Sequence, residues 1–217
     1  MWGIIPIKNI NQAKHRLKPV LYPEERQEFS KAMFEDVLST MMAVPEFEQV
    51  AVATVCPTAR IIAKKYVATV LATGQDEGQT AAVARAAEIL DAKGIAGMLV
   101  IPGDVPLVTV EEIKIVLELH EKAPSMTIVP AQDELGSNCI ALSPTIAAPL
   151  RFGPNSYFPH LETARKLGLS LQSPKLTGLG LDIDTPEDLL VLSRQTVCTR
   201  AQEYLRKKKI MERLNNE

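Results

Sequence analysis

The densest group of side chains that could do chemistry is cationic, and it follows the first apolar run, residues 3–7. Lys8, Lys14, Arg16 and Lys18 fall within 11 residues, and the last three fall within five. Such charge suits a polyphosphate, because lysine acts as a point charge and arginine as a bidentate fork. We predict that Lys8, Lys14 and Arg16 bind phosphate. The alternative is a solvated basic loop, since the segment matches neither a P-loop nor a dinucleotide-binding fingerprint.

One acid stands shortly after a later apolar run, residues 98–101. Asp104 lies between Pro102 and Pro106, and both prolines restrict the backbone around it. Magnesium prefers one or two carboxylates together with phosphate oxygens, so a fixed acid here is suited to holding Mg²⁺ against a triphosphate. We predict that Asp104 is a metal ligand. A turn acid or a helix cap is the alternative, although Thr109 is closer to the next helix and can cap it instead.

A second acidic segment contains Asp182 and Asp184 on either side of Ile183. Residues two apart in an extended chain point to the same side, so the two acids project together while Ile183 packs inward. Two like charges are costly side by side unless a cation or a hydrogen-bond donor compensates them. We predict that at least one of these acids binds a metal ion. The alternative is that Asp182 caps a turn and Asp184 begins a helix start.

Three further clusters are small and polar. Gly136-Ser137-Asn138 and Phe152-Gly153-Pro154-Asn155-Ser156 each adjoin a predicted regular element, where backbone amides and Ser156 could bind an anion. Turn and capping chemistry explains both clusters equally well. In the loop from Gly74 to Ala82, Gln79 or Thr80 could bind a base or a sugar, although a plain loop with a helix cap fits too. The three histidines show no ligand spacing.

The elements that would position these residues alternate between short apolar runs and helical patterns. We predict strands at residues 3–7, 50–55, 67–71, 98–101, 126–129, 139–142, 169–172 and 179–183. We predict helices at residues 23–42, 58–66, 79–90, 110–120 and 155–167, and another opened by Thr185 and Pro186. This alternation indicates an α/β fold with a mostly parallel sheet, in which ligands bind beyond the carboxyl ends of the strands.

Bulk composition indicates an ordinary globular protein. The 217 residues are 46% hydrophobic and 23% charged, which favours one large domain at residues 1–199, followed by a charged helical tail at residues 200–217. The net charge of -2 argues against a general nucleic-acid binder. Three widely spaced cysteines suggest reduced thiols in the cytoplasm, and we expect neither a signal peptide nor a membrane span.

Taken in order, the motifs resemble those of the 2-phospholactate guanylyltransferase family, known as CofC and, in actinobacteria, FbiD. The opening P-x-K…K-x-R-L of that family is similar to Pro6-Ile7-Lys8 with Lys14, Arg16 and Leu17. Its P-A-D-x-P-L, G-T-N, F-G-P-x-S and D-I-D-T-P-E-D-L are similar to residues 102–107, 136–138, 152–156 and 182–189. The last motif is shared with wider relatives, but the combination, over about residues 1–195, is specific.

The resemblance implies a Rossmann-like nucleotidyltransferase fold of the GT-A type, a three-layer sandwich on a mixed, mostly parallel sheet. It implies Mg²⁺ and the transfer of GMP from GTP to a small phosphorylated acid, with release of pyrophosphate, in the biosynthesis of coenzyme F(420). The acid is 2-phospho-L-lactate, phosphoenolpyruvate or 3-phosphoglycerate, and the enzyme is commonly a homodimer. No nucleic-acid or membrane partner is implied.

The resemblance also assigns residues. Asp104 and Asp184 would bind the metal with Asp182 alongside, and Lys8, Lys14 and Arg16 would face the triphosphate. The acid would be held by Ser137 or Asn138, Gly153 and Ser156, and the base-reading loop would be Gly78, Gln79 and Thr80.

This chain departs from the family pattern in two places. It has Gln79-Thr80 where the family often has Leu-Asn, and serine replaces threonine at position 137. One alternative is another nucleotidyltransferase of cofactor or sugar metabolism, using CTP or acting on the molybdenum cofactor. Those families usually open with a glycine-rich loop, where this chain has lysines. A non-catalytic nucleotide-binding module is the other alternative.

Overall fold

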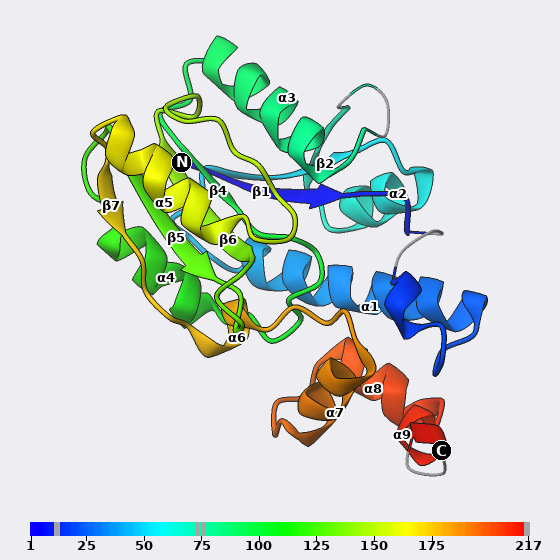
Figure 1. Cartoon of the computed structure of the whole chain (residues 1–217). Helices are drawn as coiled ribbons and strands as arrows, with labels where there is room; N and C mark the ends of the chain where they lie inside the picture. The colour runs from blue at the N-terminus through cyan, green and yellow to red at the C-terminus, as the bar shows by residue number, and fades with distance from the viewer. Residues whose placement is uncertain (11–13, 73, 75–76, 215–217) are drawn as a thin grey trace.

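Seven strands form one mixed sheet with helices on both faces (Figure 1). The computed structural model describes residues 1–10, 14–72, 74 and 77–214. The order β3-β2-β1-β4-β6-β5-β7 joins β1 (Trp2–Ile7), β2 (Gln49–Thr54), β3 (Thr69–Leu71), β4 (Met98–Val100), β5 (Ser125–Pro130), β6 (Ser137–Ser143) and β7 (Ser170–Gln172). Strand β6 is antiparallel to both neighbours, and the other pairs are parallel. The predicted α/β fold with a mostly parallel mixed sheet is confirmed.

Both faces of the sheet are covered. Helices α1 (Pro23–Met42), α2 (Pro57–Lys65) and α4 (Val110–Leu119) pack on one face, and α3 (Gln79–Ala92) and α5 (Tyr157–Lys166) pack on the other. Successive strand residues point to opposite faces, so β1 sends Ile4 toward α3 and Ile5 toward α1. Each of these side chains is fully buried, which contributes about 1.5–3 kcal/mol. Burial on both faces explains why the early strands are continuous apolar runs.

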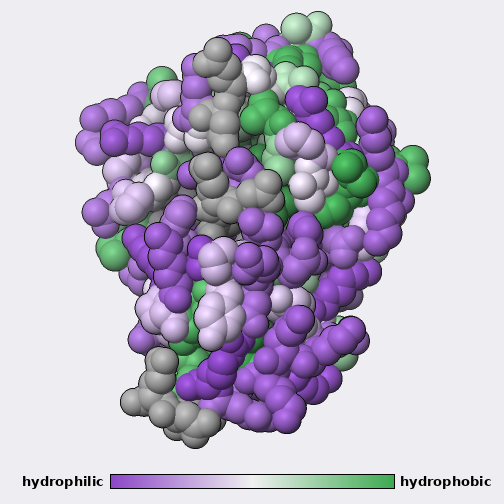
Figure 2. Space-filling view, turned by 90° about the vertical axis from the view of Figure 1, so that its right-hand side faces the viewer, coloured by the Kyte–Doolittle hydropathy of each residue, from purple (hydrophilic) through white to green (hydrophobic). Residues whose placement is uncertain are grey.

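The last helices of the described chain pack beside α1. Helices α7 (Pro186–Arg194), α8 (Arg200–Lys207) and α9 (Ile210–Leu214) share an apolar cluster with α1 and the short helix η2 (His15–Leu17). Asp36 of α1 accepts hydrogen bonds from the backbone amides of Arg200 and Ala201, both at 2.9 Å, and so caps α8. On the face shown in Figure 2, hydrophilic residues dominate the lower part, where these helices lie. The boundary at residue 199 stays a prediction, and residues 215–217 lie outside the described chain.

Helix caps follow the sequence closely. Helix α1 has the predicted bounds, and Thr109 caps α4 by accepting from the Glu112 amide at 3.1 Å. Thr185 caps α7 as predicted, and Asp188, expected only to suit the helix dipole, completes a reciprocal capping box with it. Helix α5, however, begins at residue 157 rather than 155. Ser156 occupies its cap position without capping it, because the hydroxyl bonds to another side chain.

The strand predicted at residues 179–183 is wrong. The chain instead forms a helical turn, α6 (Thr177–Gly180), followed by an irregular segment. The carboxylate of Glu112 accepts from the amides of Gly178 at 2.7 Å and Leu179 at 3.0 Å, which stabilises the turn. The amide of Ile183 then donates to the carbonyl of Asp104 at 3.0 Å, a single bond to a loop rather than a ladder. Within the described chain no helix is long and apolar enough for a membrane crossing.

Candidate active site

Most of the predicted site residues line a single cavity of about 680 Å³. Because β6 is antiparallel to β4, its first residues lie beyond the carboxyl end of β4, where ligands bind in sheets of this kind. The lining includes Lys8, Lys14, Arg16, Gln79, Asp104, Ser137, Asn138, Gly153, Ser156, Asp182 and Asp184. Of the predicted site residues in the described chain, only Gly78 and Thr80 lie outside it.

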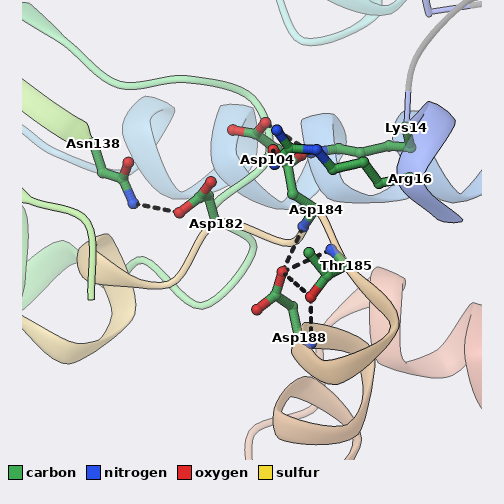
Figure 3. Close-up of polar contacts among 8 residues, drawn as sticks. All are labelled: Lys14, Arg16, Asp104, Asn138, Asp182, Asp184, Thr185 and Asp188. Atoms are coloured by element: carbon green, nitrogen blue, oxygen red, sulfur yellow. Dashed lines mark hydrogen bonds and ion pairs between the residues drawn. The ribbon is translucent and has the colours of Figure 1, made fainter. Parts of the chain in front are cut away.

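Five of these side chains form a charged cluster, which we define as Lys14, Arg16, Asp104, Asp182 and Asp184 (Figure 3). Lys14 lies between two of the acids: its Nζ donates to Asp104 Oδ2 at 2.8 Å and to Asp184 Oδ1 at 2.5 Å. Only 6% of the Lys14 side chain is exposed, whereas 70% of Arg16 is exposed and its Nη1 lies 3.9 Å from Asp184 Oδ2. Lys14 is therefore the main cation of the cluster.

The local backbone aims Lys14 at the acids. Lys14 has left-handed dihedrals, φ 57° and ψ 45°, at the start of η2. The fully buried Leu17 anchors this short helix in the apolar cluster beside α1. A left-handed conformation is uncommon for a lysine, so the tertiary contacts of η2 hold it in place.

The opposing acids are tied together through the backbone. The Ile183 amide donates to the Asp104 carbonyl, which brings the loop after β4 against the segment before α7. Asp188 Oδ2 accepts from the amides of Asp184 at 2.9 Å and Thr185 at 2.7 Å, and so fixes the turn into α7 (Figure 3). Two carboxylates from distant parts of the chain thus meet at one lysine.

The pKa values of the cluster follow its contacts. Burial alone would lower the pKa of Lys14, but the charges of Asp104 and Asp184 raise it overall, so Lys14 stays protonated. Burial would raise the pKa of Asp184, but the charge and hydrogen bond of Lys14 lower it overall. The pKa of Asp182 is raised, first by burial and then by the charge of Asp104. A 3.0 Å hydrogen bond from Asn138 Nδ2 and the charge of Lys14 act in the opposite direction and lower the pKa of Asp182 in part.

The charged cluster contains carboxylates that can be compared with the needs of a divalent cation. Asp104 Oδ1 is buried and has no hydrogen-bond partner within the protein. Asp182 has no ion pair to a cation within the described residues, and burial and the charge of Asp104 raise its pKa. No three His, Cys, Asp or Glu residues of the described chain are arranged to hold a metal by themselves. The donor set therefore fits Mg²⁺ as an ion completed by phosphate oxygens and water.

A neutral group of side chains lies at the same cavity, and we call Ser137, Ser156 and His160 the hydroxyl network. The two serines line the cavity, and His160 lies behind them in contact with Ser137. Ser156 Oγ donates to Ser137 Oγ at 3.1 Å, and Ser137 Oγ lies 3.0 Å from His160 Nδ1. All three residues are at most 7% exposed. Gly153, beside them, has a φ of +133°, which only glycine adopts readily. The structure thus joins two of the small polar clusters that the sequence singled out.

The glycine-bearing loop before α3 has a different arrangement. Gln79 lines the cavity, whereas the Thr80 hydroxyl accepts from the Phe152 amide at 3.0 Å and donates to the Phe152 carbonyl at 3.3 Å. Thr80 therefore connects the start of α3 to the segment that precedes α5. Gly78 is the cap residue of α3 with φ 93°, and Gln75 and Asp76 of the same loop lie outside the described residues.

Sequence reasoning missed His160. Its partners stand 9 and 23 residues away, at Arg151 and Ser137, so no local spacing marks it. The one available signal is position: a histidine on the buried face of an amphipathic helix needs hydrogen-bond partners.

Solved structures share this fold. A protein from Desulfovibrio desulfuricans G20 grouped with the nucleotide-diphospho-sugar transferases has a TM-score of 0.77 and 18% identity, covering 97% of this chain and 96% of its own. A cytidylyltransferase from Leptospira borgpetersenii has a TM-score of 0.61 and 13% identity, covering 99% and 95%. At these identities the likeness shows the fold alone, and this chain places opposed cations and acids in the cavity of that fold.

Sequence relatives define the chain as a nucleotidyltransferase and identify its family. The family model described as "Guanylyl transferase CofC like" matches residues 1–216, and the chain belongs to this family. A phosphoenolpyruvate guanylyltransferase from Roseiflexus castenholzii is 34% identical, covering 95% of this chain and 94% of its own. A 3-phospho-D-glycerate guanylyltransferase from Colwellia psychrerythraea is 32% identical, covering 88% and 90%. A 2-phospho-L-lactate guanylyltransferase from Methanothermobacter thermautotrophicus is 31% identical, covering 94% and 89%.

Proposed function

We propose that this chain transfers GMP from GTP to a small phosphorylated acid, with release of pyrophosphate, in the biosynthesis of coenzyme F(420). The names of its relatives support guanylyl transfer to such acids. The observation that carries the proposal is the cavity in which Lys14 and two acids lie together with buried serine hydroxyls. Lys14 and the acids suit the triphosphate and its metal, and the serine hydroxyls suit the phosphorylated acid.

The reaction needs no general base. An oxygen of the acceptor phosphate forms a bond to the α-phosphorus of GTP while the bond from that phosphorus to the bridging oxygen breaks, and its electron pair leaves with pyrophosphate. A phosphate is already ionised near pH 7, so catalysis reduces to alignment and charge neutralisation. Lys8, Lys14 and Arg16 would neutralise the departing pyrophosphate, which agrees with their place in the cavity lining.

Lys14 has to serve two partners in turn. In the free enzyme it neutralises Asp104 and Asp184. Bound Mg²⁺, held by Asp104 and an adjacent acid, Asp184 or Asp182, would supply positive charge against the phosphates. Lys14 is protonated and lines the cavity, so it would be a donor to phosphate oxygens of the bound nucleotide. The partnerless Oδ1 of Asp104 supports this assignment.

Three acids are candidates for the acceptor, namely 2-phospho-L-lactate, phosphoenolpyruvate and 3-phosphoglycerate. Mass spectrometry after incubation with GTP, Mg²⁺ and each acid tests the proposal directly. We expect a guanylylated product with one acid at least and equimolar pyrophosphate. Nucleotide binding without any product would instead favour a non-catalytic module.

Nucleotide preference needs its own test, because Gln79 replaces the leucine that the family often carries in this loop. A parallel reaction with CTP distinguishes guanylyl transfer from the cytidylyl alternative. We expect GTP to be preferred. A preference for CTP would favour another nucleotidyltransferase of cofactor or sugar metabolism.

We further propose a cytoplasmic homodimer. The free cysteines support a reducing compartment: Cys56 and Cys139 are buried, and Cys198 is an exposed thiol. The dimer rests on the family resemblance. Light scattering is expected to give twice the chain mass, and fractionation of native cells is expected to place the chain in the cytoplasm.

A further inference from the structure

His160 connects the segment before α5 to the serines of the cavity. Its Nε2 lies 3.0 Å from the backbone nitrogen of Arg151, and its Nδ1 lies 3.0 Å from Ser137 Oγ. A backbone amide can only donate, so Nε2 is the acceptor of the first bond. In the neutral ring the proton therefore lies on Nδ1, which donates to Ser137. The contacts select one tautomer of the buried imidazole.

That tautomer determines the direction of the Ser137 hydroxyl. A serine oxygen has two lone pairs and one proton. His160 Nδ1–H and the Ser156 hydroxyl both donate to Ser137 Oγ, at 3.0 and 3.1 Å. Both lone pairs are then occupied, and the Ser137 O–H is left to donate. Ser137 lines the cavity, so its proton is available to a bound molecule.

We propose that His160 is a positioning residue that orients the Ser137 hydroxyl as a donor toward an anionic oxygen of the acceptor acid. The inference rests on the proposed function, which supplies that acid. Phosphate and carboxylate oxygens only accept hydrogen bonds, so a hydroxyl with the opposite orientation would present a lone pair to a negative charge. The T-shaped contact of the His160 and Phe152 rings, with centroids 6.0 Å apart, holds the imidazole beside this segment.

The arrangement is insensitive to pH in the physiological range. Burial lowers the pKa of His160 to about 4. The ring is therefore neutral at pH 7, and Nε2 remains able to accept from Arg151. A protonated ring would turn two donors, Nε2–H and the amide, toward each other.

Two amide substitutions separate the two bonds of the ring. In His160→Asn the amide nitrogen can occupy the position of Nδ1 and donate to Ser137. In His160→Gln the amide oxygen can occupy the position of Nε2 and accept from Arg151, but the donor to Ser137 is lost. We expect His160→Gln to raise KM for the acid about tenfold and to leave KM for GTP unchanged. In His160→Asn we expect an acid KM much closer to that of the wild type. An unchanged acid KM in His160→Gln would overturn the inference, as would an equal rise for both substrates.

A double variant tests whether His160 acts through Ser137. We expect Ser137→Ala to raise the acid KM, and the addition of His160→Gln to raise it no further. A second, independent rise would overturn the inference, because His160 would then act on the acid by another route.

The tautomer itself can be observed without turnover. Imidazole ¹⁵N shifts of the free protein, with the His160 signal identified by its absence in His160→Gln, are expected to show Nδ1 protonated and Nε2 bare at pH 7. A proton on Nε2 would overturn the inference whatever the activity. If wild type guanylylated none of the three acids, the proposed function and the acceptor role would fall together. If the wild type were active and His160→Gln left the KM for the acid unchanged, the inference alone would fall.

Discussion

Two groups of side chains border the same cavity and are built on opposite electrostatic principles. The charged cluster sets full charges against one another, with 31% of the Asp104 side chain and 40% of the Asp184 side chain exposed. The hydroxyl network is neutral and almost fully buried. Under the proposed function the first would exchange partners when a charged ligand binds, whereas the hydrogen bonds of the second are already formed in the free protein. Preorganised donors of this kind require no rearrangement at the moment of reaction.

The greatest effect is expected from removing one carboxylate of the charged cluster. We expect Asp104→Asn to lower the transfer rate on the order of 10³-fold, because the proposed metal ligand is lost. Asp133→Asn is the matched control: this acid also lines the cavity but accepts from the Leu135 amide, which an asparagine oxygen can still do. Pyrophosphate release measures both. Turnover near wild type in Asp104→Asn would remove this acid from the mechanism.

The hydroxyl network predicts a second effect, on stability below neutral pH. Because the folded pKa of His160 is lowered to about 4 and the unfolded value is about 6.5, the unfolded chain binds more protons between these pH values. Stability is therefore fully present above pH 6.5 and falls as pH drops toward 4, by at most about 3 kcal/mol.

Urea unfolding of wild type and His160→Gln between pH 4 and 7 measures this dependence. The difference between the two proteins cancels the other titrating groups. Parallel pH profiles would show that His160 is not held neutral.

The charged cluster predicts a smaller loss of stability when its central cation is removed. Lys14→Met leaves Asp104 and Asp184 facing each other, and we expect a loss of about 2 kcal/mol, reduced by solvent from the 3–5 kcal/mol typical of a fully buried pair. Arg16→Met, on an exposed side chain, should cost less than about 1 kcal/mol. Chemical denaturation checks both. Equal losses would mean that Lys14 is no more important to the cluster than Arg16.

Much of this architecture could be predicted from local sequence. The apolar runs identify the strands, and Thr109 and Thr185 mark helix starts because their caps involve residues three positions away. The cavity could be anticipated because motifs that follow strands meet at one edge of the sheet. The motifs predict that Lys14, Asp104 and Asp184 lie at one site. They do not predict that Lys14 bridges the two carboxylates directly.

Distant contacts explain what local sequence could not predict. Residues 179–183 look like a strand, but Glu112, 66 positions before Gly178, accepts from the amides of Gly178 and Leu179, and the carbonyl of Asp104 accepts from the amide of Ile183. The predicted start of α5 is two residues early, and Ser156 at the cap position bonds to Ser137 rather than to the helix. His160 gains its role from partners on β6 and in the preceding loop, and these are visible only in three dimensions.

In our proposal the charged cluster binds GTP and the hydroxyl network binds the acid. The kinetics of Ser137→Ala and Arg16→Met, with each substrate varied in turn, are the sharpest test of it. We predict a crossed pattern: Ser137→Ala raises KM for the acid about tenfold and leaves KM for GTP unchanged, and Arg16→Met does the reverse. If both variants raised KM for the same substrate, the charged cluster and the hydroxyl network would not bind separate partners, and the assignment would be wrong.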